Sequence, residues 1–283
     1  MKKILAIALA LVMMFACVGV LAACDSTGDG EETTTEAATT PAATTEAATT
    51  EEKNDEDEDA KKPVLKMGTN AYFQPYEYYD GENIIGIDAE FAALIAEKLG
   101  MTGVIVDMEF DTFLTGVNEG SVDFGMAGMT VTPDREKEVD FSISYANGKQ
   151  VVIVKEDSPI THVDDLFAKG ATYTAGVQLG TTGDIYATGD LGEDRVTAYN
   201  NANNAVMALV AGDIDCVIID NEPAKALVEA NAGLKILEPA YAAEDYAICV
   251  KKGNSALLEK LNDAILALTE EGKIDEVLDK YIK

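Results

Sequence analysis

Residues 195–220 read "RVTAYNNANNAVMALVAGDIDCVIID", and this stretch decides the fold class. Residues 195–199 carry β-branched and aromatic side chains that are typical of a strand. Residues 203–212 have the apolar spacing of a helix and end in glycine, where helices commonly stop. Residues 214–220 form an apolar run that is typical of a strand buried on both faces. A strand, a helix and a doubly buried strand in this order predict an α/β fold with parallel strands.

The same alternation of strands and helices extends from residue 64 to the end of the chain. Further strands are predicted at residues 64–69, 104–108, 122–129, 151–155, 171–177 and 246–250. Further helices are predicted at residues 87–100 with Asp88 as N-cap, at 111–120 and 163–170, from Asp184 and Pro223 onward, and at 255–272 and 274–283.

This series of units is too long for one small sheet, so we predict two lobes. The alternation pauses at residues 145–150 and 244–247, where we expect the chain to cross between the lobes through a two-strand hinge. Each lobe is then a mostly parallel sheet flanked by helices. Residues 63–146 and 245–283 are assigned to lobe 1, and residues 147–244 to lobe 2.

The N-terminus has the pattern of an export signal. Two lysines precede the apolar residues 4–23, and "LAAC" ends the run at Cys24. This ending resembles the lipobox of bacterial lipoproteins, so residues 1–23 are predicted to be a signal peptide and Cys24 the lipidated first residue of the mature protein. The protein is then extracytoplasmic, at the cell surface or in the periplasm, and anchored to the membrane by its lipid alone. An uncleaved signal anchor is the alternative, because the run is long enough to span a bilayer.

Residues 24–62 are predicted to form the lipidated cysteine and a disordered tether. The segment is rich in Thr, Ala, Glu and Asp, and "TTEAATT" occurs at residues 34–40 and again at 44–50. Such a composition cannot bury enough apolar surface to offset the entropy of ordering. The whole chain has a formal net charge of −30, which excludes nucleic acid and anionic lipid surfaces as partners.

The cysteine and histidine content argues against a metal centre, a cofactor site or a disulfide framework. Cys216 and Cys249 lie in apolar strand-like runs, where buried free thiols are expected. His162 is the only histidine, and no Cys-x-x-Cys pair occurs. We therefore predict neither bound metal nor cofactor.

The candidate ligand-binding residues follow the predicted strands or lie in the stretch "GMAGMTVTPDREKEVDFS" at residues 125–142. Ligands of open α/β sheets bind beyond the carboxyl ends of the strands. One guanidinium, threonine-rich turns, one carboxylate and the aromatic rings of Phe73, Tyr76 and Phe110 suit the carboxylate, ammonium and side chain of a zwitterionic α-amino acid. The candidate residues are Asn70, Phe73, Phe110, Gly128, Thr130, Arg135, Gln178, Thr182 and Asp220.

Several motifs together resemble one known family. "LKMGTNAYFQPYEY", "GMTVTPDREKEVDFS", "GVQLGTT", "VIIDNEPA" and "KIDEVLDKYIK" are similar to the extracytoplasmic solute-binding proteins of family 3, the amino-acid receptors of ABC importers. The resemblance implies a two-lobed periplasmic-binding-protein-like fold of type II. It also implies a monomer that carries a free amino acid to the transmembrane subunits of an ABC permease.

The resemblance also implies a role for individual residues. Arg135 would hold the ligand carboxylate in a bidentate pair, assisted by Thr130 and Thr182. Gly128 would offer its carbonyl to the ammonium group, and Asp220 would pair with that group. Phe73 and Phe110 would enclose the ligand side chain.

Some of these residues have structural alternatives. Phe73 and Phe110 could be core residues, and Asp220 could be the N-cap of the helix that follows it. Thr132 before Pro133 has the pattern of an N-cap with proline at the first helical position. The acidic residues around Glu244 are interpreted as solvated surface.

The neutral side chains of Asn70 and Gln178 favour a neutral or polar amino acid, since many family members that take basic amino acids have aspartate at the position of Asn70. An amino-acid-sensing module for a separate signalling partner is one alternative function. A dehydratase-like enzyme of the same fold is the other, with Glu77 in the same cleft. No nucleophile, metal cluster or histidine base accompanies these residues, so we expect no catalysis.

Overall fold

The computed structural model describes residues 62–282. The predicted signal peptide, Cys24 and all of the predicted tether except Lys62 lie outside the described residues. Within the described part, no helix combines the length and hydropathy that crossing a bilayer requires.

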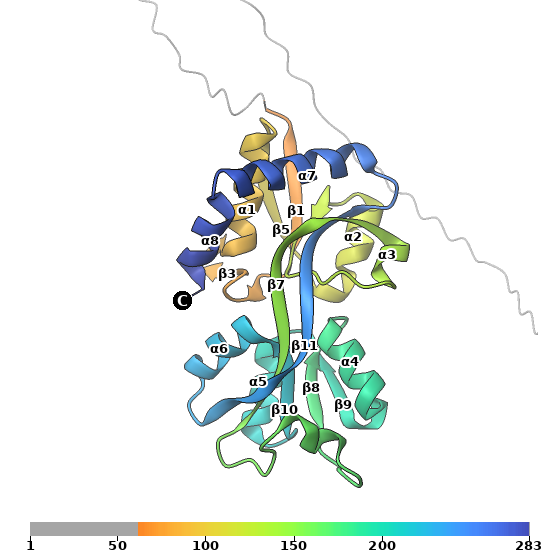
Figure 1. Ribbon diagram of the computed structural model, residues 1–283, viewed down its shortest axis with the longest axis vertical. Helices are drawn as coiled ribbons and strands as arrows, with labels where there is room; N and C mark the ends of the chain where they lie inside the picture. Colours follow the sequence, from red (N-terminus) through yellow and green to blue (C-terminus); the bar gives the residue numbers. More distant parts are fainter. Residues whose placement is uncertain (1–61, 283) are drawn as a thin grey trace, which may run out of the picture. The chain divides into compact units, whose positions relative to one another are not determined.

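Strands and helices alternate along the described chain (Figure 1). The strands are β1 Val64–Thr69, β2 Tyr72–Phe73, β3 Glu77–Asp80, β4 Asn83–Ile85, β5 Thr102–Asp107, β6 Phe124–Gly125, β7 Val139–Lys155, β8 Ala175–Gln178, β9 Val196–Tyr199, β10 Cys216–Asp220 and β11 Leu234–Lys251. The α-helices are α1 Ile87–Lys98, α2 Phe113–Glu119, α3 Arg135–Glu138, α4 Thr182–Leu191, α5 Ala202–Ala211, α6 Asn221–Ala230, α7 Ser255–Glu270 and α8 Lys273–Tyr281.

The strand–helix–strand unit predicted at residues 195–220 is confirmed as β9, α5 and β10. Asn201 caps α5, because its side chain accepts a hydrogen bond from the backbone N–H of Asn204 at 3.0 Å. Gly212 ends the helix in a left-handed conformation with φ 88°. All five residues of β10 are buried, as its continuous apolar run predicts.

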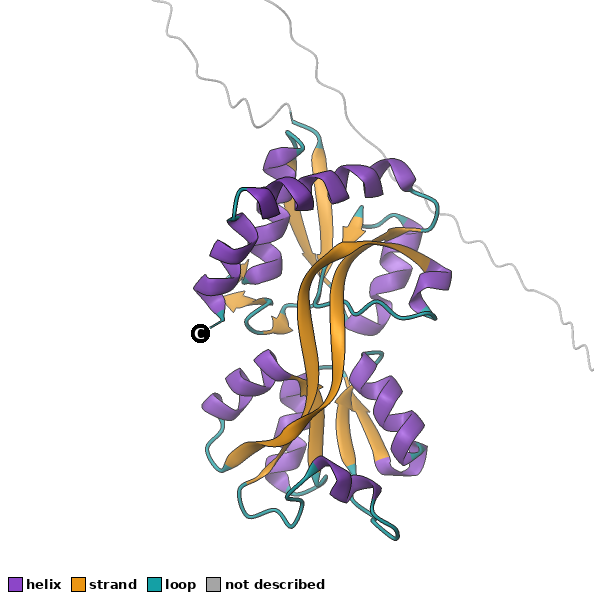
Figure 2. Ribbon diagram, in the orientation of Figure 1, coloured by secondary structure: helices purple, strands orange, loops and turns teal. Residues whose placement is uncertain are grey.

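The strands form two groups of parallel strands joined by two long antiparallel ones, in the order β5-β1-β6-β11-β7-β10-β8-β9. Strand β1 pairs in parallel with β5 and β6, and β8 pairs in parallel with β9 and β10. Strands β7 and β11 run side by side and pair with each other along both groups. Helices flank both groups of strands (Figure 2). This is the predicted two-lobed α/β class, with β7 and β11 as the two joining strands.

Separate apolar clusters support the two groups of strands. Val217 and Ile219 of β10 pack with α5, whereas Cys216 and Ile218 face the opposite cluster, which contains Ala187 of α4. Successive strand side chains point to opposite faces, so both faces of this strand are covered.

The C-terminal helices pack on the core of the first strand group. Leu261 and Ile265 of α7 and Val277 of α8 share one cluster with Leu65 of β1 and Ile95 of α1. The C-terminal segment therefore returns to the first strands of the chain. The residue boundaries assigned to the two lobes stay predictions.

Three local predictions are wrong. Gly86, not Asp88, is the N-cap of α1; it has φ 126°, and a Cβ there would lie 2.2 Å from the Tyr76 carbonyl oxygen. The α-helix predicted at residues 163–170 is a short 3-10 helix, Val163–Phe167, whose capping box uses the side chains of His162 and Asp165.

The third wrong prediction concerns the helix after Thr132. The α3 helix begins at Arg135 with Asp134 as its N-cap, so proline does not occupy its first position. The Thr132 hydroxyl nevertheless accepts a hydrogen bond from the Arg135 backbone N–H at 3.2 Å, as a capping threonine does.

Candidate functional site

All nine predicted binding residues line one pocket. They come from both strand groups, because the carboxyl ends of β1, β6, β8 and β10 face this pocket. The complete lining is Asn70, Phe73, Glu77, Phe110, Ala127, Gly128, Thr130, Arg135, Gln150, Gln178, Thr181, Thr182, Ile218, Ile219, Asp220, Glu244 and Tyr246. The structure thus brings the nine residues together, and their roles toward a ligand stay predictions.

Arg135 supplies the positive charge of the pocket. Its side chain is buried, and it donates hydrogen bonds to the backbone carbonyls of Thr130 at 2.8 Å and Gly180 at 3.1 Å. The guanidinium lies 5.6 Å from the centre of the Phe110 ring. No carboxylate of the described residues lies within 4.0 Å of it. Arg135 is therefore held in place by neutral groups. Burial lowers its pKa and the charge of nearby Glu244 opposes this, while its charge stays available to an anionic ligand.

Thr182 lies at the first position of α4 and borders the same pocket. The preceding residue, Thr181, caps the helix by accepting a hydrogen bond from the Asp184 backbone N–H at 3.3 Å. The N-terminus of a helix carries partial positive charge and unpaired backbone N–H groups. A ligand carboxylate between Arg135 and this helix end would be stabilised both by the guanidinium charge and by the partial positive charge of the helix N-terminus.

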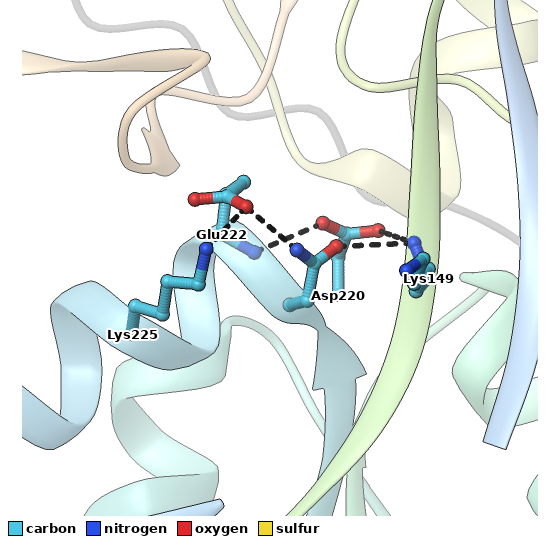
Figure 3. Close-up of polar contacts among 5 residues, drawn as sticks. Lys149, Asp220, Glu222 and Lys225 are labelled. Carbon is cyan, nitrogen blue, oxygen red and sulfur yellow. Dashed lines mark hydrogen bonds and ion pairs between the residues drawn. The ribbon is translucent and has the colours of Figure 1, made fainter. Parts of the chain in front are cut away.

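Asp220 ends β10, is buried and is one of the acidic groups of the pocket; its carboxylate lies between Lys149 and Glu222 (Figure 3). Its carboxylate accepts hydrogen bonds from the backbone N–H groups of Glu222 at 3.3 Å and Lys149 at 3.2 Å, and from the Tyr246 hydroxyl. Asp220 is therefore the N-cap of α6 and a pocket residue at once. Burial raises the pKa of Asp220 to about 7, so its charge is sensitive to an approaching cation.

A buried carboxyl pair lies behind Gly128. The Gly128 backbone, at φ 52°, donates its N–H to Asp88 at 2.9 Å, and the Tyr145 hydroxyl donates to the same oxygen at 2.9 Å. Glu77 faces Asp88 and lines the pocket. Burial and the neighbouring Asp88 raise the pKa of Glu77 well above its usual range. This shift favours the protonated form of Glu77 beside Asp88, whose pKa burial raises only to about 6.

Asn70 and Gln178 form a neutral bridge across the pocket. The Gln178 amide donates to the Asn70 side-chain oxygen at 2.9 Å, and the Asn70 amide donates to the Met108 carbonyl at 2.9 Å. Both side chains are buried. The bridge joins the end of β1 to the end of β8, that is, one strand group to the other.

Phe73 and Phe110 both pack against buried residues and border the pocket, two roles that the sequence left as alternatives. Both rings line the pocket and are only partly buried. Phe73 stacks on Tyr76 with ring centres 5.7 Å apart, and Phe110 stacks on Phe113 at 6.0 Å. Each ring is thus backed by a buried aromatic residue and exposes its remaining surface to the pocket.

The interpretation of Glu244 as solvated surface is wrong. Glu244 is only 6% exposed, lines the pocket and accepts a hydrogen bond from the Gln150 amide at 2.8 Å. The alternation of strand β11 accounts for this position, since Glu244 and the buried Tyr246 share one face while Asp245 between them is exposed. Gln150, on the neighbouring strand β7, was also missed.

The two predicted thiols, Cys216 and Cys249, are buried and free. Burial raises the pKa of both to about 12, so they stay protonated at neutral pH. Within residues 62–282 no group of His, Cys, Asp and Glu side chains is arranged to hold a metal ion.

Comparison with known proteins agrees with this architecture. A model of the bacterial extracellular solute-binding proteins, family 3, matches residues 65–283. The arginine-binding extracellular protein ArtP of Bacillus subtilis is 32% identical over 232 residues, which cover 79% of this chain and 88% of ArtP. The glutamine-binding protein GlnH of an ABC transporter from the same organism is 29% identical over 286 residues, covering 100% of this chain and 98% of GlnH.

A solved structure shows the same arrangement of elements. The crystal structure of the substrate-binding protein of an amino acid ABC transporter is 36% identical, superposes with a TM-score of 0.73, and covers 77% of this chain and 99% of its own. The family match extends over most of the sequence and over all of the pocket residues. The chain therefore belongs to the bacterial extracellular solute-binding proteins of family 3.

Proposed function

We propose that this protein is an extracytoplasmic receptor that binds a free amino acid and delivers it to the transmembrane subunits of an ABC permease. One observation carries the proposal: a buried guanidinium without a carboxylate partner and a buried carboxylate line the same pocket. These two groups match the carboxylate and the ammonium group that every free α-amino acid presents.

The ligand would bind with its carboxylate on Arg135, Thr130 and the start of α4, and with its ammonium group between Asp220 and the Gly128 carbonyl. Phe73 and Phe110 would border its side chain. Side-chain hydrogen bonds already join the proposed lobes, among them those from Gln178 to Asn70, from Arg135 to Gly180 and from Tyr246 to Asp220. The ligand would add further links between the same two lobes, so binding would favour their closed arrangement.

A thermal-shift screen of the full chain against the standard amino acids tests this function. A ligand present at one hundred times its dissociation constant adds about 2.7 kcal/mol to the free energy of unfolding. We expect one or a few amino acids to raise the melting temperature, whereas their amides and N-acetyl derivatives, which lack one charge, do not. If no amino acid changes the melting temperature, the proposed function fails.

The preference for a neutral or polar ligand, which rests on Asn70 and Gln178, stays a prediction. The relatives named above bind arginine and glutamine according to their names, so they do not decide between a charged and a neutral side chain. Both alternatives to import, a sensing module and a dehydratase-like enzyme, lack a supporting observation of their own. We propose that the protein acts as a monomer.

Lipid attachment at Cys24 is part of the proposal and is tested separately. Replacing Cys24 with serine is expected to move the protein from the membrane fraction to the soluble fraction, because the acyl chains would be its only anchor. Cys17→Ser is the matched control, since Cys17 lies inside the predicted signal peptide and should leave the protein at the membrane. Retention of the Cys24→Ser variant in the membrane, with the signal still attached, favours a signal anchor.

A further inference from the structure

Negative charge exceeds positive charge in the ligand pocket. Among the described residues that line it, Arg135 is the only cationic one, whereas Asp220, Glu244 and Glu77 are acidic. Burial and the neighbouring Asp88 raise the pKa of Glu77 well above its usual range, which favours a single negative charge on this pair. A zwitterionic ligand would use Arg135 and Asp220 with its main-chain groups. Glu244 is near enough to Arg135 to favour the charged guanidinium, but one cation cannot balance Asp220, Glu244 and the carboxyl pair together, so the pocket would keep an excess of negative charge.

The pocket also lacks hydrogen-bond donors for its buried acceptors. One carboxylate oxygen of Glu244 (Oε1) and the side-chain oxygen of Gln150 have no hydrogen-bond partner, although both atoms are buried. The Tyr186 side chain of α4 lies near Glu244: burial raises the pKa of Tyr186, and the charge and hydrogen-bonding of Glu244 add to this rise, yet Oε1 of Glu244 itself is left without a hydrogen-bond partner. Buried acceptors without donors cost free energy, so a ligand that brings donors is favoured.

We propose that the ligand is an amino acid with a cationic side chain, carrying a guanidinium or ammonium group, and that Glu244 is a principal determinant of this preference. The inference rests on the proposed function and specifies its substrate class. It differs from the expectation drawn from Asn70, whose side chain is neutral. Asn70 is already committed to Gln178 and Met108, so its neutrality does not set the charge of the pocket.

The expected size of the preference follows from electrostatics. A unit charge about 7 Å from a second one, at an effective dielectric constant of about 20, changes affinity roughly fiftyfold. The preference of a real pocket is reduced by the cost of desolvating the ligand cation. We therefore expect a discrimination of roughly tenfold or more between a cationic ligand and a neutral ligand of the same shape.

Paired ligands test the inference on the unmodified full chain. Arginine and citrulline have side chains of the same length, but arginine ends in a charged guanidinium group and citrulline in a neutral ureido group. Lysine and norleucine form a second pair, in which only lysine carries a charged ammonium group on its side chain. Titration calorimetry is expected to show arginine or lysine binding at least about tenfold tighter than its neutral counterpart. If citrulline binds within threefold of arginine and norleucine within threefold of lysine, or if a neutral amino acid binds most tightly, the inference fails while the proposed function stands. If no amino acid binds at all, the proposed function itself fails.

The Glu244→Gln variant tests the assigned residue. Glutamine keeps an oxygen that can accept the hydrogen bond from Gln150, so the main loss is one negative charge. The ratio of arginine to citrulline affinity is expected to fall by roughly tenfold, with citrulline binding nearly unchanged. Asp245→Asn is the matched control, because it removes one charge from the adjacent exposed position and should alter the ratio less than twofold. An unchanged ratio in a folded Glu244→Gln variant overturns the role of Glu244. If that variant does not fold, the paired ligands on the unmodified chain still decide the substrate class.

Discussion

Replacing Arg135 with alanine is expected to weaken amino-acid binding by roughly one and a half to three and a half orders of magnitude. The guanidinium is buried and has only backbone carbonyls as hydrogen-bond acceptors, so a ligand carboxylate would be its anionic partner. Truncation leaves that carboxylate desolvated and unpaired, which costs roughly 2 to 5 kcal/mol. Titration calorimetry with an amino acid identified by the thermal-shift screen measures the change.

Two further variants separate binding from folding. Arg135→Lys should recover little affinity, because an ammonium group cannot reproduce the planar, two-pronged geometry of the guanidinium. Arg195→Ala is the matched control, since Arg195 also donates to backbone carbonyls, those of Tyr173 at 2.8 Å and Leu166 at 2.9 Å, but does not line the pocket. We expect Arg195→Ala to lower the melting temperature and leave affinity unchanged. Binding of Arg135→Ala within threefold of the unmodified protein would show that the carboxylate site lies elsewhere.

Lowering the pH is expected to weaken ligand binding by about tenfold for each pH unit below about 7, through protonation of Asp220. Burial raises the pKa of Asp220 to about 7 in the unliganded protein. An ammonium ligand favours the ionised carboxylate and therefore has to expel this proton at lower pH. Titration calorimetry between pH 5 and pH 8 measures how the affinity changes with pH. Repeating the titration in buffers of different ionisation enthalpy gives the number of protons released on binding.

The stability of the unliganded protein should change with pH in the opposite direction to the ligand affinity. Burial raises the pKa of Asp220 to about 7 and that of Asp88 to about 6, whereas the ordinary aspartate value is 3.8. Between these values the native state binds more protons than the unfolded state, so these groups make the protein more stable as the pH falls from about 7 toward about 4. Each contributes at most about 1.4 kcal/mol per pH unit.

Asp220→Asn is the control for both responses. The variant should bind the ligand weakly at every pH, lose the slope between pH 5 and pH 8, and keep only the smaller stability change due to Asp88. An affinity of the unmodified protein that stays constant over this range would show that Asp220 is already ionised without ligand. In that case the ammonium group would bind a preformed charge, and no proton would be released.

The sequence by itself determined the fold class and the set of candidate residues. The apolar runs of β1 and β10 and the spacing in α1 and α5 are local patterns, because a strand or helix must bury the side chains on its own face whatever lies beside it. Ligand residues such as Arg135 and Asp220 were found because they follow strands, and the carboxyl ends of parallel strands meet at one edge of a sheet. The family motifs in the same places strengthened that assignment.

Only the tertiary structure decided which polar residues face the pocket and which charges remain unbalanced there. Glu244 and Asp245 are adjacent acidic residues in the sequence, and the register of β11 against β7 buries one and exposes the other. Asp88 has the pattern of a helix cap, but its carboxylate faces Glu77 and Gly128, which are distant in the sequence. Burial, the sign of the local field and the shifted pKa of a carboxyl group depend on neighbours that only the folded chain brings together, so no local pattern contains them.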